Sequence, residues 1–191
     1  MRVMRAFPVL LLFFLAPPFW ETKPAEKWTD REIDTVLHAS PWAEMVGPPP
    51  EVLVYLATAA PIEEAEGELR LRTKHPLAEP DPDYNNYLRE NHEQTLVLAI
   101  PYNQPVRFGT AEEQRRMEEE CEMVIARKHY KLVGHFPPTG EDPVLRLVFP
   151  REVQRTDKAV IFRLYLPGMP FPEREVEFRT KDLLYRGKLE M

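Results

Sequence analysis

The sequence predicts an α+β fold: a mixed, largely antiparallel β-sheet with three or four short helices, mainly in the N-terminal half. Three observations predict this fold class. Helix start signals lie before residue 121, apolar runs typical of strands follow from residue 123 onward, and short loops with Pro or Gly separate most of these runs. Closely spaced strands favour an antiparallel meander, which is consistent with a sandwich-like arrangement in the C-terminal half.

Two kinds of start signal mark the helices. Thr29 and Thr110 are each followed three residues later by Glu, which forms a capping box over the first free backbone N–H groups of a helix. Asp81 is followed by Pro82, a residue suited to the first helical position. The predicted helices run from Thr29 to about Ser40, from Ile62 to Arg72, from Pro82 to Glu90, and from Thr110 to about Glu120.

Apolar runs mark the strands. Val52–Leu56 and Thr95–Ile100 are apolar at successive positions, as in strands covered on both faces. Because helices separate these two runs, we expect a crossover connection and a parallel pair. Further strands are predicted at Met123–Ala126, Tyr130–His135, Val144–Phe149, Ala159–Leu166, Glu173–Phe178 and Leu184–Leu189. Pairing of the last two would place the glutamates of the first beside Arg186 and Lys188.

The N-terminal segment predicts export. Arg2 and Arg5 precede the apolar run Val9–Ala16, and prolines follow, which is the layout of a secretory signal. We expect residues 1–22 to be the signal segment, cut between Ala16 and Ala25, and residues 23–191 to form a single α+β domain. The protein is then periplasmic or secreted. The alternative is an uncleaved membrane anchor, although the run is shorter than the roughly 20 apolar residues of a full span.

Charge and composition exclude several classes of function. The net charge of −6 disfavours nucleic acid and anionic lipid as partners, since both require clustered Lys and Arg. Only 7 glycines occur in 191 residues, and no glycine-rich phosphate-binding loop or G-x-S-x-G nucleophile motif is present. We therefore expect no cofactor.

One cluster has residue types that bind metals. Cys121, His129 and His135 lie close in sequence, but the second cysteine of a closed zinc site is missing. Surface histidines and no metal are the preferred interpretation. As the single cysteine, Cys121 cannot form an internal disulfide, which leaves a buried thiol, an intermolecular bridge or a reactive thiol.

Four large apolar residues are candidates for binding a partner. Trp28 and Trp42 flank the first helix and would form an aromatic platform if exposed, although packing against the sheet is the preferred role. Met169 and Phe171 lie in the stiff segment LPGMPFP, which would display them to an unknown protein or envelope partner, or fold them back over the sheet.

Several motifs resemble a class of uncharacterised exported bacterial proteins. They are W-T-D-R-E-I-D at 28–34, S-P-W-A at 40–43, F-P-R at 149–151 and the tail D-L-L-Y-R-G-K-L-E at 182–190. The resemblance covers most of the chain after the signal segment. It implies export but assigns no activity to any residue.

The function predicted from the sequence is a non-catalytic binding or structural accessory protein acting outside the cytoplasm. The alternatives are a secreted hydrolase without a recognisable motif and a membrane-tethered partner-binding protein. An enzyme should show a concave pocket with convergent titratable groups, whereas an accessory protein should show an apolar patch near Trp42 or Met169.

Overall fold

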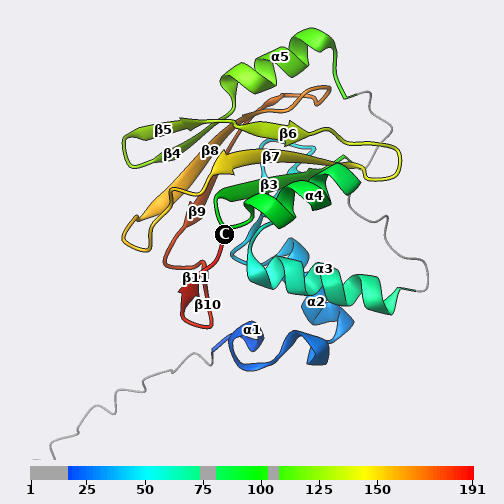
Figure 1. Ribbon diagram of the computed structural model, residues 1–191, viewed down its shortest axis with the longest axis vertical. Helices are drawn as coiled ribbons and strands as arrows, with labels where there is room; N and C mark the ends of the chain where they lie inside the picture. Colours follow the sequence, from blue (N-terminus) through cyan, green and yellow to red (C-terminus); the bar gives the residue numbers. More distant parts are fainter. Residues whose placement is uncertain (1–16, 74–80, 103–107) are drawn as a thin grey trace, which may run out of the picture.

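The computed structural model describes residues 17–73, 81–102 and 108–191 (Figure 1). It has the predicted α+β class, with antiparallel sheets and helices that lie mainly in the first half of the chain. One sheet has the order β1-β2-β3-β7-β6, and a second has the order β5-β4-β8-β9. Every strand pair in both sheets is antiparallel.

The elements have the following bounds. The five-stranded sheet contains β1 (Ala43–Val46), β2 (Val52–Leu56), β3 (Thr95–Pro101), β6 (Gly134–Phe136) and β7 (Val144–Pro150). The four-stranded sheet contains β4 (Glu122–Ile125), β5 (Lys128–Lys131), β8 (Ala159–Tyr165) and β9 (Glu173–Arg179). A hairpin of β10 (Leu184–Tyr185) and β11 (Lys188–Leu189) ends the chain. The helices are α1 (Phe19–Thr22), a 3₁₀ turn (Ala25–Lys27), α2 (Asp30–His38), α3 (Ala60–Arg72), α4 (Pro82–Asn91) and α5 (Ala111–Glu120).

The helix starts agree with the predicted signals. Both capping boxes form, with the Thr29 and Thr110 hydroxyls accepting backbone N–H bonds and Glu32 and Glu113 bonding back to the cap residues. The Asp81 side chain accepts a hydrogen bond from the backbone N–H of Asp83. These starts were predictable because each signal and its target lie within three residues of each other.

The core lies where the two sheets face each other. Phe149 of β7 meets Phe162 of β8 at 5.3 Å between ring centroids, and Phe162 meets Phe178 of β9 at 6.1 Å. Residues of β9 alternate between exposed and buried because only one face of the second sheet is covered. Strand β3 is buried along most of its length because helices cover the other face of its sheet (Figure 1).

The expected parallel pairing of the two apolar runs is wrong. β2 and β3 are antiparallel, with Tyr55 opposite Ala99 and Leu56 opposite Leu98. Two helices, not one, separate the strands, so the chain returns to the end of the sheet where β2 finishes. A single crossover helix would instead have brought it back to the start of β2.

The expected pairing of the last two predicted strands is also wrong. β9 pairs with β8 alone, and residues 184–189 fold back on themselves through a turn in which Arg186 and Gly187 have positive φ. The cation beside Glu175 is Arg163 of β8, at 3.1 Å. The run predicted as one strand at 130–135 is divided between β5 and β6, which belong to different sheets.

Helix α1 lies within the segment predicted as the signal, and it contacts the domain. Phe19 packs edge-on against Trp28 at 5.7 Å, and Trp20 packs against Trp42 at 5.9 Å. The Glu21 carboxylate accepts hydrogen bonds from the backbone N–H of Arg186 at 3.0 and 3.1 Å. Residues 1–16, which include the apolar run, lie outside the described residues. In the described ranges, no helix has both the length and the apolar character that a membrane span requires.

Candidate ligand-binding cleft

The two tryptophans proposed as a platform are buried in the core. Trp28 is 2% exposed and Trp42 is 0% exposed. The indole N–H of Trp28 donates to the Lys23 carbonyl at 3.0 Å, and that of Trp42 donates to the Glu190 carbonyl at 2.9 Å. Both side chains therefore act in packing, and neither is available as an exposed platform.

Met169 and Phe171 are placed in different surroundings. The expected turn forms at Pro167 and Gly168, closed by a hydrogen bond from the Met169 N–H to the Leu166 carbonyl at 3.3 Å. Met169 is half-buried and lines a hollow of about 660 Å³ together with Tyr102 and Val52, while Phe171 is 63% exposed. The two side chains thus do not share one pocket, and partner contact at this loop stays a prediction.

The structure does not gather Cys121, His129 and His135 into a site. Cys121 is buried, its sulfur accepts the Tyr165 N–H at 3.3 Å, and burial raises the pKa of its thiol to about 11. His129 pairs with Glu122 at 3.1 Å, and His135 lies 3.8 Å from Glu118. Across the described ranges, no three His, Cys, Asp or Glu side chains are placed to hold a metal.

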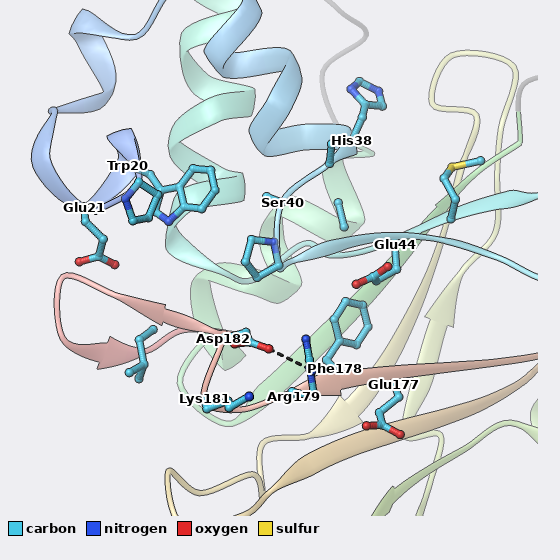
Figure 2. Close-up of a pocket in the computed structure, with 16 residues that line it drawn as sticks. Trp20, Glu21, His38, Ser40, Glu44, Glu177, Phe178, Arg179, Lys181 and Asp182 are labelled. Carbon is cyan, nitrogen blue, oxygen red and sulfur yellow. Dashed lines mark ion pairs between the residues drawn. The ribbon is translucent and has the colours of Figure 1, made fainter. Parts of the chain in front are cut away.

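A hollow of about 770 Å³ lies between α1, the end of α2, β1 and β9 (Figure 2). Figure 2 shows Glu44 from β1 and Glu177 from β9 at its sides, with Phe178 between them and the Arg179–Asp182 ion pair nearby. Glu44 and Glu177 are exposed, and the ion pair of 2.9 Å is partly so. Water competes for solvated charges of this kind, which makes this hollow the weaker candidate for a built site.

A second cleft lies between α3 and the helix-covered face of the five-stranded sheet. Tyr55 of β2 is opposite Ala99 of β3, and Ala99 is opposite Arg146 of β7. Residues directly opposite each other lie on the same face of a sheet, so these three side chains share this face. Leu53, Pro101 and Val144 are two residues along the same strands and so share the face. Ala99 is small and adds no bulk between Tyr55 and Arg146.

We call this region the Glu66 cleft. It consists of a hollow of about 290 Å³ over the sheet and a hollow of about 400 Å³ between α3 and α4, and Glu66 and Arg70 line both. Half of the residues that line the first hollow are apolar, namely Leu37, Leu53, Leu69, Pro101, Pro143 and Val144. The other half are polar: His38, Tyr55, Glu66, Arg70, Asp142 and Arg146.

Glu66 is the acid at the centre of the cleft. The Tyr55 hydroxyl donates to Glu66 Oε1 at 3.2 Å. Burial raises the pKa of the Glu66 carboxyl above its usual range, because a desolvated carboxylate loses its hydration. Burial and the neighbouring Glu66 charge together raise the pKa of Tyr55.

Asp142 and Arg146 form an ion pair that lines one side of the cleft. The Arg146 guanidinium donates to Asp142 at 2.5 and 3.3 Å, and it lies 4.3 Å from the ring centroid of Tyr84. The backbone N–H of Asp81 donates to the same Asp142 carboxylate at 2.9 Å. This buried pair ties the start of α4 to β7, and the Arg146 charge is compensated.

Arg70 differs from Arg146. It lies one turn after Glu66 on α3, on the same side of the helix, and its positive charge lowers the pKa of Glu66 against the effect of burial. The guanidinium makes no hydrogen bond and no ion pair within 4 Å with the residues that the structure describes. Arg70 is thus a cation beside an apolar hollow, available to a ligand.

No local motif in the sequence marks Glu66, Arg70 or Tyr55. One signal was present: Glu66 is four residues after Ile62 and three before Leu69, so it lies on the apolar face of α3. An acidic residue on such a face is unusual and indicates a role beyond solvation. Its partners on β2 and β7 could not be found without the sheet register.

Comparison of the chain with protein-family models, with curated proteins and with solved structures finds no match. The function of the cleft must therefore be argued from its geometry.

Proposed function

We propose that the chain is an exported, non-catalytic binding protein whose Glu66 cleft holds a small ligand. The observation that carries the proposal is the hollow of about 290 Å³, whose lining combines apolar side chains with Tyr55, Glu66 and Arg70. Small-molecule sites typically combine an apolar lining with a few convergent polar groups that fix orientation. Arg2, Arg5 and the apolar run Val9–Ala16 support export.

The size of the hollow limits the ligand. Since one water molecule takes about 30 Å³ in the liquid, 290 Å³ corresponds to roughly ten such volumes. A ligand of about ten non-hydrogen atoms is the matching size. The hollow also shares His38, Leu53 and Pro101 with the hollow beside Met169, so a longer ligand has room to extend in that direction.

Binding without catalysis is favoured by the other groups of the cleft. The remaining carboxylates are already paired: Asp142 with Arg146, and Glu63 with His92 at 3.0 Å. Among the described residues that line the two hollows, there is no Ser, Thr or Cys to act as a nucleophile.

One observation favours a second candidate function, a hydrolase. A concave site with convergent titratable groups is the feature expected of an enzyme, and the raised pKa of Glu66 suits a general acid. Such a reaction would still require an activated water or nucleophile. Under this alternative, Glu66→Gln would abolish turnover and leave binding intact, whereas binding alone predicts no turnover to lose.

The test uses the protein expressed with its native N-terminus and recovered from cell fractions. We expect a shortened chain, by intact mass, in the periplasm or medium. This product should bind 1-naphthylamine, a neutral, environment-sensitive fluorophore of about eleven non-hydrogen atoms, with an increase in its fluorescence. Leu53→Trp should fill the hollow and weaken this binding at least about tenfold, since the larger side chain takes up the space beside the other apolar lining residues.

Leu71→Trp is the matched control. Leu71 is 83% exposed on α3 and lines neither hollow, so the same change in size should leave binding of the fluorophore unaltered. Equal binding by Leu53→Trp and the unmodified protein, or no binding by either, would contradict a ligand site in the cleft. A full-length product held in the membrane would contradict cleaved export and favour the tethered alternative.

A further inference from the structure

We infer that the Glu66 cleft selects a medium-chain monocarboxylate, a ligand with one carboxylate head and an unbranched apolar body. The inference rests on the proposed function and names the chemical class that the site takes. Three features lead to it: the cation of Arg70, the hydrogen bonding of the Glu66 carboxyl, and the apolar side chains that line the hollow.

Arg70 provides the charge that recognises the head group. Its guanidinium has no ion pair within 4 Å among the described residues, and it lies at the border of both hollows. A guanidinium presents its N–H groups in a planar fork that matches two carboxylate oxygens. By contrast, an ammonium ligand would meet this uncompensated cation and be repelled.

Glu66 provides a second donor when it is neutral. Its Oε1 already accepts the Tyr55 hydroxyl, and its Oε2 makes no hydrogen bond within the described part of the chain. Burial favours the protonated carboxyl, in which Oε2–H is a donor that requires an acceptor. A ligand carboxylate supplies that acceptor and accepts from Arg70 at the same time.

The apolar lining of the hollow sets the body of the ligand. Leu37, Leu53 and Leu69 line the hollow together with Pro101 and Val144. A chain of about eight carbons with a terminal carboxylate has ten non-hydrogen atoms, the number that the volume allows. Burial of each CH₂ group from water favours such a chain over a short one.

The nearby acidic groups do not oppose the head group. Glu63 is hydrogen-bonded to His92 and does not line the 290 Å³ hollow, and Asp142 is paired with Arg146 and with the backbone N–H of Asp81. Apart from Glu66 itself, the charged side chain of this hollow without an ion pair among the described residues is therefore Arg70.

The experiment measures displacement of 1-naphthylamine by octanoate, octan-1-ol and octylammonium, which share the same chain and differ in the head group. We expect octanoate to bind at least about tenfold more tightly than octan-1-ol, as a charge-assisted hydrogen bond allows, and octylammonium to bind least. Arg70→Gln should weaken octanoate about tenfold and leave octan-1-ol unchanged. Arg127→Gln, an exposed arginine on the turn after β4, is the control and should change neither.

Glu66→Gln tests whether the protonated or the ionised carboxyl of Glu66 contacts the ligand. Glutamine keeps a neutral donor, so octanoate should bind within about threefold of the unmodified protein. If octylammonium bound best and Glu66→Gln abolished it, Glu66 would be an anionic acceptor and the inference would be overturned. Equal binding of octanoate and octan-1-ol, with no effect of Arg70→Gln, would also overturn it while leaving the proposed function intact. Failure of the fluorophore to bind would instead remove the proposed function itself.

Discussion

Glu66 is the residue on which the candidate site and the predicted pH dependence of stability both rest. It lies on the apolar face of α3, accepts the Tyr55 hydroxyl and has a raised pKa because burial disfavours its charge. The titratable and charged groups around it are His38 on α2, Tyr55 on β2, Glu63 and Arg70 on α3, Tyr84 on α4, Asp142 before β7, and Arg146 on β7.

The raised pKa predicts how stability depends on pH. Between the unfolded and folded pKa values of Glu66, the folded state holds a proton that the unfolded state has lost. The contribution of Glu66 to the free energy of unfolding is therefore fully present below about pH 4.5, and it is lost as pH rises through the folded pKa. Glu66→Gln should remove this fall, so the variant should gain stability relative to the unmodified protein as pH rises from 4 to 8.

Urea unfolding at several pH values measures this difference. Glu68→Gln is the control: Glu68 lies on the same helix and forms an ion pair with Arg72 at 2.7 Å. It should not reproduce the pH-dependent gain. An identical pH profile for Glu66→Gln and the unmodified protein would show that the pKa of Glu66 is not raised by folding, which would contradict this prediction.

At the scale of single elements, the sequence predicts features that depend on residues close together in the chain. The helix starts at Thr29, Asp81 and Thr110 were predictable because a capping side chain and its target are neighbours in the chain. The strand β1 was missed because four residues with exposed Glu44 and Met45 give little periodic signal. Strand partners were not predictable, since cross-strand neighbours such as Ala99 and Arg146 are far apart in sequence.

The contacts of α1 predict that a chain with this helix is more stable than a chain without it. Phe19 and Trp20 pack edge-on against Trp28 and Trp42, so a chain that begins at Lys23 loses both contacts. We expect it to be less stable than a chain that begins at Pro17 by about 2 to 4 kcal/mol, from lost burial and aromatic pairing.

Thermal and urea unfolding of the two chains provide the comparison. A chain that begins at Pro17 and carries Phe19→Ala and Trp20→Ala should reproduce most of the loss, which assigns it to the two rings. The same chain with Glu26→Ala, an exposed residue of the 3₁₀ turn, should remain as stable as its parent. Equal stability of the chains that begin at Pro17 and Lys23 would mean that α1 contributes nothing to the fold.

At the scale of the whole molecule, the Glu66 cleft is a product of topology. Its lining comes from α2, β2, α3, β3 and β7, and it forms because one face of the five-stranded sheet is covered by helices (Figure 1). The sequence predicts the fold class but not this site, because none of its residues forms a local motif. The residues that did stand out in the sequence, Trp28 and Trp42, are buried in the core.

The most direct test of the cleft is a two-dimensional ¹H–¹⁵N NMR titration of the folded protein with octanoate. The largest shifts should fall on amides at Leu53, Tyr55, Glu66 and Arg70, with saturation that follows the displacement assay, and Arg70→Gln should reduce them. Shifts confined to the hollow beside Glu44 and Glu177, or to the loop at Met169 and Phe171, would place binding elsewhere. Either pattern, or no saturable shift, would contradict a ligand site centred on Glu66.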